Sequence, residues 1–307
     1  MRNCLYRAQT MLETMEIEKD VKLALQSALQ MVLAEKEKYD EAVSLYERLF
    51  RRDEPHDGAA VMEGGEDACI GEIYTAVLFA RVCELCAGKD YRTFKGSVDF
   101  ITPLFRFLKR NKARYGHYYL MSSYRNWCYR YAFPCCVTLG RLAFEMTTFS
   151  FPFEVCDIEG NCTPLSIDES ADYKKVLKQG DPVLAVHIPG NDKLTQEAVE
   201  ESFALAEEFF TQYFPKYHSK AYVCSSWLLD TGLSQFLPEN SNILKFQKFF
   251  NIVSGPVNDF SLYKNIFGLE QACPLEQLVP TNSFQKKVLE YVKDGGLLYS
   301  GKGYILS

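Results

Sequence analysis

The sequence predicts a helical N-terminal domain followed by a mixed α/β domain, and a change in pattern near Pro134 carries this prediction. Before that point, apolar side chains recur at helical spacings, and no segment predicts a strand with confidence. After it, short runs rich in β-branched and aromatic residues alternate with amphipathic helical patterns. Such alternation is typical of a mixed sheet flanked by helices. We therefore expect a helical domain over 1–134 and an α+β or α/β domain over 135–307.

The expected helices of the first domain follow from the spacing of their apolar residues. The periodic stretch 5–50 predicts helix, with breaks between Thr14 and Asp20. Further helices are expected over 72–86, 98–109 and 118–131. Gly88 is a suitable residue to end the first of these three.

The expected elements of the second domain alternate between the two periodicities. Thr195 can cap the clearest amphipathic helix of the chain, over 195–213. Shorter helices are expected over 241–250 and 283–293. The predicted strands are 136–149, 153–158, 182–188, 221–228, two short ones within 251–267, and a glycine-punctuated strand over 297–305.

Charge and cysteine usage narrow the class of protein. The formal net charge of −6 argues against nucleic acid as a partner, because nucleic-acid binding needs a basic footprint. The 11 cysteines are scattered through apolar segments, which indicates reduced thiols and a cytoplasmic protein. The best apolar run, Ile73 to Ala80, stops at Arg81 and is too short to cross a bilayer. We expect neither a membrane anchor nor a signal peptide, and the sequence leaves the oligomeric state open.

Four segments of the chain resemble landmarks of a bacterial acyltransferase family. They are TLGRLAFE at 138–145, VHIPG at 186–190, CSSWLL at 224–229 and ENSNILKFQ at 239–247. Members of that family have a helical N-acyltransferase N-terminal domain and a GNAT-like C-terminal domain. The resemblance implies an N-acyltransferase with a GNAT-like mixed sheet. It would use acetyl-CoA or another acyl-CoA, and its acceptor would be the amine of a small molecule or peptide.

The resemblance also implies where acyl-CoA would bind. A GNAT fold places it beside a splayed pair of strands, here 182–188 and 221–228, with its pyrophosphate over the loop and helix N-terminus between them. Backbone N–H groups at a helix N-terminus attract phosphate. The residues expected to bind the cofactor are Ile188, Gly190, Asn191, Lys193 and Thr195.

The loop at 189–194 departs from the glycine-rich pyrophosphate loop of the GNAT fold. It holds a single glycine, and Asp192 and Glu197 add negative charge near the expected phosphates. This departure favours an alternative function, a GNAT-like scaffold that has lost catalysis and binds a ligand or a protein partner.

Acyl transfer to an amine needs a base, an acid for the thiolate and donors for the carbonyl oxygen. Strand alternation places Arg141, Ala143 and Glu145 on one face, where Glu145 can act as base. The alternative is an Arg/Glu pair on a solvated sheet face. His187, at the end of an apolar strand, is a second acid/base candidate, or else a structural histidine. Arg141, Ser226 and Trp227 are expected to bind the acceptor.

Two cysteine arrangements suggest other chemistry. Cys224 on the strand after His187 would permit a covalent acyl-thioester, although cysteine in an apolar strand is more often a core residue. Cys83 and Cys86 have the spacing of zinc ligands but no second pair at the expected distance, so we expect no metal.

The stretch 106–141 is unusually basic and aromatic. It carries eight Lys and Arg residues, no Asp or Glu, and interleaved Tyr and Trp residues. Such a stretch can bind an anionic ligand with a stackable ring, including the 3′-phospho-adenosine of coenzyme A or RNA. The alternative is a helical face that packs against the acidic remainder of the chain.

Overall fold

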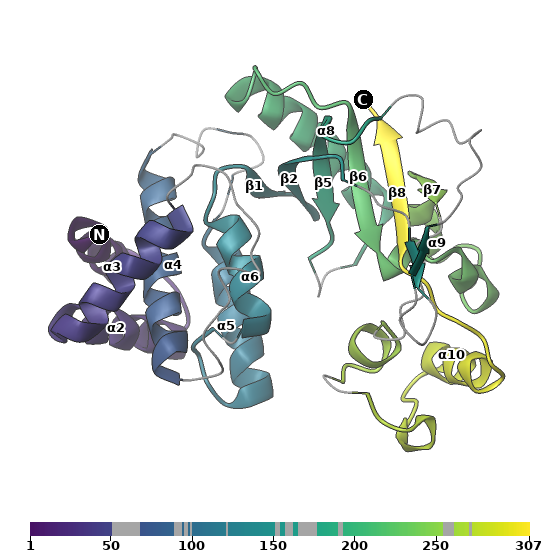
Figure 1. Ribbon diagram of the computed structural model, residues 1–307, viewed down its shortest axis with the longest axis horizontal. Coiled ribbons are helices and arrows are strands. Elements are labelled where there is room, and N and C mark those ends of the chain that lie inside the picture. The colour runs from purple at the N-terminus through teal and green to yellow at the C-terminus, as the bar shows by residue number, and fades with distance from the viewer. Residues whose placement is uncertain are drawn as a thin grey trace. The chain divides into compact units, whose positions relative to one another are not determined.

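The computed structural model divides the chain into two compact units, Met1–Leu139 and Gly140–Ser307 (Figure 1). The domain boundary predicted from the sequence lies after residue 134. The residues that the structure describes are 1–50, 68–88, 94, 98, 100–120, 122–150, 154–156, 162–164, 177–189, 193–253, 261–269 and 272–307.

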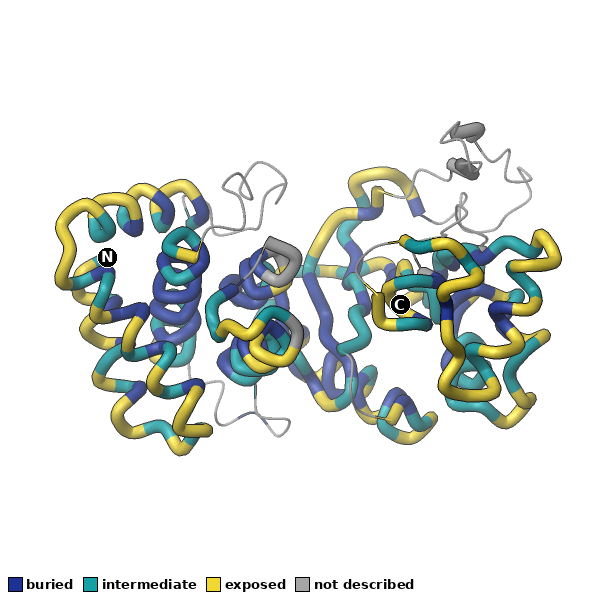
Figure 2. The backbone as a smooth tube through the Cα atoms, turned by 90° about the horizontal axis from the view of Figure 1, so that it is seen from below, coloured by how far each residue is buried: buried dark blue, intermediate teal, exposed yellow. Residues whose placement is uncertain are grey.

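The first unit is built from helices, and one of them forms its centre. Its elements are α1 (Arg2–Thr14), α2 (Lys19–Ala34), α3 (Lys36–Phe50), α4 (Ala68–Gly88), α5 (Thr102–Tyr115) and α6 (Ser122–Tyr131), followed by strand β1 (Cys136–Leu139). Helix α4 contacts α1, α2, α3 and α6. Every residue from Ile73 to Ala80 on it is buried, which Figure 2 shows in dark blue. A helix that is apolar on all sides is stable only when other helices surround it. Within the described residues, no helix is long and apolar enough to cross a membrane.

The second unit is organised around a mixed sheet. Its strands and helices, in chain order, are β2 (Leu142–Thr148), β3 (Glu154–Cys156), β4 (Cys162–Pro164), β5 (Pro182–His187), α8 (Gln196–Tyr213), β6 (Ala221–Ser226), α9 (Asn242–Gln247), β7 (Asn251–Val253), α10 (Ser283–Lys293) and β8 (Gly301–Leu306). The order in the sheet is β1-β2-β5-β6-β8-β7, and β3 and β4 form a separate pair. Strands β5 and β6 run parallel, whereas β2 with β5, β6 with β8 and β7 with β8 are antiparallel.

Helices cover one face of this sheet, which we call the helix face. The ring of Phe203 on α8 lies 5.8 Å from the ring of Phe144 and 5.0 Å from that of Tyr222. Because side chains alternate along a strand, residues one position away point to the opposite face. That face bears Glu145, so we call it the Glu145 face. At one end of it, a cluster formed by Phe149, Leu177, Val183, Ala221 and Val223 is buried.

The strand predicted over 136–149 is interrupted, and a glycine is the reason. Gly140 has a φ of +62°, a left-handed conformation that side chains with a Cβ rarely adopt. Gly140 and Arg141 therefore form a turn between β1 and β2. The hydroxyl of Ser202 on α8 accepts hydrogen bonds from the backbone N–H groups of Arg141 and Leu142, at 2.7 and 3.3 Å. Arg141 consequently lies in a turn next to α8, and not on the strand with Ala143 and Glu145.

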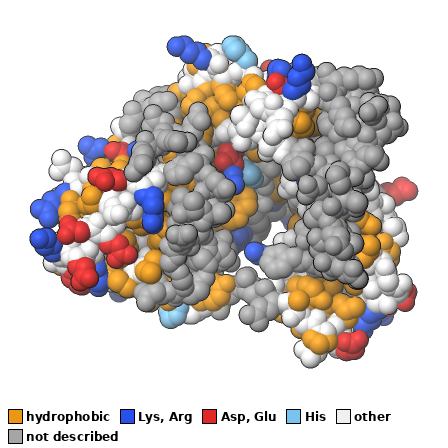
Figure 3. Space-filling view, viewed as in Figure 1, with side chains coloured by type: hydrophobic (Ala, Val, Ile, Leu, Met, Phe, Trp, Pro, Cys, Tyr) orange, Lys and Arg blue, Asp and Glu red, His pale blue; other side chains and the backbone are white. Residues whose placement is uncertain are grey.

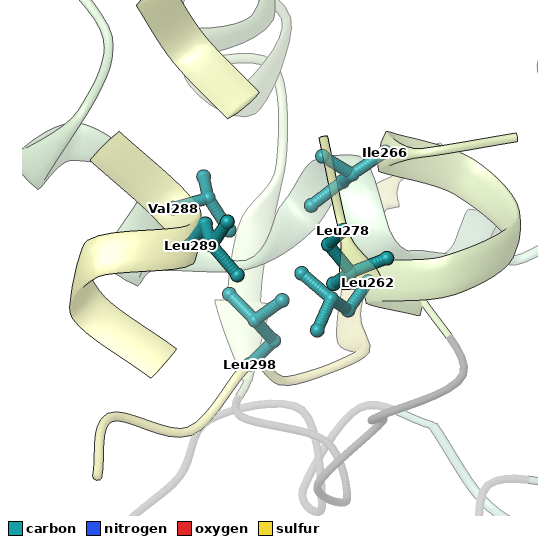
Figure 4. Close-up of a cluster of buried hydrophobic side chains, with 6 residues drawn as sticks. All are labelled: Leu262, Ile266, Leu278, Val288, Leu289 and Leu298. Carbon is teal, nitrogen blue, oxygen red and sulfur yellow. The ribbon is translucent and has the colours of Figure 1, made fainter. Parts of the chain in front are cut away.

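A second apolar cluster gathers the segments that follow the sheet. Its buried members, drawn in Figure 4, are Leu262, Ile266, Leu278, Val288, Leu289 and Leu298. One of its segments, η5 (Ser261–Ile266), is a helical turn where the sequence analysis expected a short strand. Its inward-facing Leu262 and Ile266 are four residues apart, which suits one face of a helical turn.

Short helical turns connect the end of β6 to this cluster. They are η3 (Trp227–Leu229) and η4 (Thr231–Gln235), with η6 (Leu275–Gln277) further along the chain. Between the first two, the buried carboxylate of Asp230 accepts hydrogen bonds from the backbone N–H groups of Gly232 and Tyr299, both at 2.9 Å. Burial raises the pKa of Asp230 above its ordinary value. This carboxylate ties the chain after β6 to the segment that precedes β8.

Candidate active site

Glu145 and His187 form a carboxylate–imidazole pair on the Glu145 face. His187 ends β5, and Ala143 on β2 is its partner in the sheet. Glu145 is two residues further along β2, on the same face and diagonal to His187. The Oε2 atom of Glu145 lies 2.8 Å from Nε2 of His187. The two residues that the sequence analysis proposed as separate bases are therefore in direct contact.

Burial strengthens this contact, and the charge of the carboxylate determines which group donates the hydrogen bond. The side chain of Glu145 is 5% exposed and that of His187 is 20% exposed. A buried carboxylate is stable only with hydrogen-bond donors or opposite charge nearby. When Glu145 is ionised, its carboxylate accepts hydrogen bonds and donates none, and Nε2 of His187 then carries the hydrogen of this bond. In neutral imidazole the other nitrogen, Nδ1, is then the basic one.

The parallel strands β5 and β6 pair with each other over a short length. Leu184 is the partner of Tyr222, and Ala185 is the partner of Val223. Strand β5 continues to His187 and β6 to Ser226, beyond the last registered pair. The carboxyl ends of β5 and β6 thus extend past their shared ladder, and His187 stands on one side of that end. Ligands of open α/β sheets bind at the carboxyl ends of the strands.

Positive side chains lie at the start of α8. The guanidinium Nε of Arg141 donates to the backbone carbonyl of Lys193 at 3.2 Å, which holds Arg141 against the segment that enters α8. Thr195 caps the helix by accepting from the N–H of Ala198 at 3.3 Å. Arg141, Lys193 and Thr195 are therefore close together. Arg141 was predicted to bind the acceptor, and Lys193 and Thr195 were predicted to bind the cofactor.

Glu197 brings a negative charge to the same helix end. Hydrogen bonds from its own backbone N–H and from Thr195 lower the pKa of its carboxyl, and Lys245 adds a further lowering. The N–H of Val199 donates to the carbonyl of Thr195. The N–H groups of Glu197, Ala198 and Val199 thus already have acceptors within the chain. An anion at this position would be attracted by the side chains of Arg141 and Lys193 more than by open backbone groups.

The remaining predicted residues divide into two groups. Ile188 directly follows His187 and is half-buried, while Gly190 and Asn191 lie outside the described residues. The hydroxyl of Ser226 accepts from the N–H of Leu228 at 3.2 Å and so begins the turn after β6. Trp227 packs against the apolar cluster of Figure 4. The structure does not bring Ser226 or Trp227 together with the Glu145–His187 pair.

The pairing of Cys224 with His187 considered above does not form. Cys224 is the partner of Gly303, whose position faces Phe250 and Leu229 on the helix face. His187 lies on the Glu145 face, so the sheet separates the two side chains. Burial raises the pKa of Cys224 to about 12, as expected for a core thiol. Within the described part of the chain, no group of three or more His, Cys, Asp or Glu side chains could hold a metal ion.

Cations of the basic aromatic stretch have partners within the helical unit. Arg125 is 1% exposed, its Nε donates to the carbonyl of Leu120 at 2.8 Å, and its guanidinium lies 4.7 Å from the ring of Tyr74. Lys109 pairs with Glu18. On the face of the helical unit seen in Figure 3, Lys and Arg side chains alternate with Asp and Glu. These contacts support the interpretation of the stretch as a packed helical segment.

Ser225 and Lys302 were not among the site residues predicted from the sequence. They are directly opposite each other on β6 and β8. Alternation from Val223 could have assigned Ser225 to the Glu145 face. Lys302 required knowledge that the C-terminal strand lies next to β6, which one sequence does not provide.

A family model and several solved structures match this chain. The family described as "GNAT-like C-terminal domain" matches residues 136–305. Among curated proteins, no sequence matches. A structure of a mutant acyltransferase in complex with octanoyl-CoA has a TM-score of 0.68 and 20% identity, over 99% of this chain and 87% of that one.

Two further solved structures are similar. An acyltransferase in complex with CoA and 10C-teicoplanin has a TM-score of 0.66 and 20% identity, over 95% of this chain and 88% of that one. An acyltransferase in complex with decanoyl-CoA and teicoplanin has a TM-score of 0.64 and 18% identity, over 99% and 87%. At these identities the likeness establishes a shared fold.

Proposed function

Because this chain belongs to the family with the GNAT-like C-terminal domain, we propose that it is an N-acyltransferase that uses acyl-CoA. The observation that carries the proposal is the Glu145–His187 pair, 2.8 Å apart, at the carboxyl end of β5. The acyl-CoA or CoA held by the similar structures supports the choice of donor. The acceptor is an amine of a small molecule or peptide.

The roles of the two residues follow from their contact. Acyl-CoA would supply an acyl group that is already activated as a thioester. His187 accepts through Nδ1 the proton that the amine loses, because its Nε2 hydrogen is held by the carboxylate. Glu145 orients the ring and stabilises the positive charge that the imidazole gains. His187 is thus the base, and Glu145 is a positioning residue.

The charges at the start of α8 suit the phosphates of coenzyme A. Arg141 and Lys193 provide two cations, Thr195 orders the first turn, and the dipole of an 18-residue helix adds partial positive charge. Ile188, Gly190 and Asn191 remain proposed cofactor contacts on the segment between His187 and Lys193. Ser226 and Trp227 would act on the acceptor side only indirectly, through the shape of the chain after β6.

A scaffold without catalysis is the alternative function. Glu197 favours it, because its carboxylate stands where a phosphate would bind. Such a scaffold would bind a ligand or protein partner without acyl transfer. It predicts that loss of the His187 imidazole changes nothing measurable.

Calorimetry followed by a transfer assay tests the proposal. Titration of the protein with acetyl-, octanoyl- and decanoyl-CoA should give saturable heat for at least one donor. That donor, with a panel of amines that includes teicoplanin, should give an acylated product by mass spectrometry. No heat with any donor would contradict the use of acyl-CoA.

The role of His187 is tested with a matched histidine. His187→Asn should lower turnover about 10²–10⁴-fold, the usual contribution of a general base, while the circular dichroism spectrum is preserved. His218→Asn is the control, since His218 is exposed on the segment that precedes β6. Binding without transfer by the unaltered chain would favour the scaffold.

A further inference from the structure

Ser225 and Lys302 lie side by side on the Glu145 face. Ser225 on β6 is the partner of Lys302 on β8, and the preceding pair on that face is Val223 with Tyr304. Val223 belongs to the buried cluster of the same face, and the partly buried Tyr304 packs against it. Residues two positions along a strand share a face, so Ser225 and Lys302 point to the side of the sheet that carries Glu145 and His187. Directly opposite side chains in antiparallel strands have Cβ atoms about 5 Å apart.

This pair stands across the strand ends from His187. Ala185 and Val223 are the last registered residues of the parallel pair. His187 and Ser225 are each two residues beyond them, on neighbouring strands and on the same face. Adjacent strands are about 4.8 Å apart where they are paired. The base and the hydroxyl–ammonium pair therefore lie on the same face of the sheet, beyond the last registered residues of β5 and β6.

We propose that Ser225 and Lys302 form the acid side of the acyl transfer, opposite the base His187. This inference rests on the proposed function, which requires an acid that the Glu145–His187 pair does not provide. His187 takes one proton from the amine as the new N–C bond forms. When the C–S bond breaks, its electron pair stays on the sulfur. Ser225 donates one proton to that sulfur. Lys302 returns a proton to Ser225, and exchange with solvent resets His187 and Lys302.

The ammonium of Lys302 is the necessary part of this pair. A hydroxyl alone is a weak acid, whereas an ammonium group is charged at neutral pH and stabilises a thiolate nearby. Lys302 acts through Ser225 and is in that sense a positioning residue. Ser225 would touch the reacting sulfur and is a catalytic residue. Two sides with opposite roles explain why the base His187 lies on β5 and the hydroxyl of Ser225 on β6.

Binding of free coenzyme A tests this inference without any turnover. If Lys302 and Ser225 stabilise a thiolate, bound CoA has a lower thiol pKa than free CoA, and its affinity rises as the pH approaches that of the free thiol, about 8.5. Calorimetry at pH 7.0, 8.0 and 9.0 would compare CoA with desulfo-CoA, which lacks the sulfur. The ratio of the two affinities should rise about tenfold for each unit by which the pKa is lowered.

Variants assign the effect to the two residues. Lys302→Met should make the affinity ratio independent of pH, Lys302→Arg should preserve its rise, and Ser225→Ala should reduce it. Lys287→Met on the exposed face of α10 is the matched control. The other titratable groups on the Glu145 face in the described part of the sheet are Glu145 on β2, His187 on β5 and Tyr304 on β8. They act on both ligands alike unless they touch the sulfur.

Each result decides a different question. Failure of both ligands to bind would contradict the proposed use of acyl-CoA. Binding of CoA with an affinity ratio that does not change with pH in the unaltered chain would overturn the acid side alone. The same ratio in Lys302→Met as in the unaltered chain would overturn the role of Lys302.

Discussion

At the scale of single residues, a contact between distant positions defines the candidate site. Glu145 and His187 are 42 positions apart in the sequence, and the antiparallel register of β2 and β5 brings them to 2.8 Å. Side chains that act through one contact lose function as a unit, so their effects on turnover do not add.

The first prediction is this lack of additivity. Glu145→Gln keeps the size of the side chain but removes its charge, and should lower turnover about 10–10²-fold through a poorly stabilised imidazolium. The double variant with His187→Asn should be no slower than His187→Asn alone. Steady-state kinetics on the four proteins measure this cycle. Independent, multiplying losses would show that the two residues do not cooperate.

The residue types of the site were predictable, but their partners were not. His187 at a strand end and Glu145 on an alternating strand carry signals in the sequence. Arg141 was misplaced because the pattern across 136–149 gives no sign that Gly140 adopts a positive φ and ends a strand. Ser225 and Lys302 were overlooked because their pairing depends on a non-local strand order.

At the scale of elements, helix α8 links the sheet to the proposed phosphate site. Thr195 and the apolar stripe of this helix were predicted, since capping and periodicity are local signals. The N–H groups of its first turn were expected to be open to phosphate. Instead, Thr195 and Glu197 themselves accept hydrogen bonds from the first turn.

Removing the charge of Glu197 should therefore strengthen cofactor binding. Because the pKa of Glu197 is lowered, mainly by the hydrogen bond from its own backbone N–H, its carboxylate is charged at neutral pH. Glu197→Gln should raise the affinity for CoA a few-fold at low salt, and the gain should shrink as salt screens the charge. Glu200→Gln, one turn further along the exposed side of α8, is the control.

Calorimetry at 20 and 200 mM salt would measure this effect. The screening length differs about three-fold between these two concentrations. An unchanged affinity in Glu197→Gln at both concentrations would place the phosphates away from α8.

At the scale of the whole molecule, the two units have separate cores. The core of the helical unit surrounds α4, and the core of the second unit lies on the two faces of its sheet. The change from helical to mixed periodicity predicted two parts, because composition and period change together. Each part has a large apolar core of its own, which permits independent unfolding.

Buried thiols should report this independence. Burial raises the pKa of Cys83 in the helical unit and of Cys224 in the second unit to about 12, so both are unreactive until their unit opens. Pulse labelling with iodoacetamide in increasing urea, read by peptide mass spectrometry, should give two different midpoints. Half-exposed Cys4 and Cys273 are the controls that react without denaturant. Coincident midpoints for Cys83 and Cys224 would contradict separate unfolding.

The apolar cluster at the end of β6 also gives the molecule an optical reporter. The chain has two tryptophans, of which Trp127 is exposed and Trp227 packs against the cluster of Figure 4. Trp227 is two residues beyond Ser225, on the same stretch of backbone. In a Trp127→Phe background, the emission of the remaining indole would follow any movement of β6 when a ligand binds beside His187. Because Trp227 packs against this cluster, its fluorescence should report occupancy of the site.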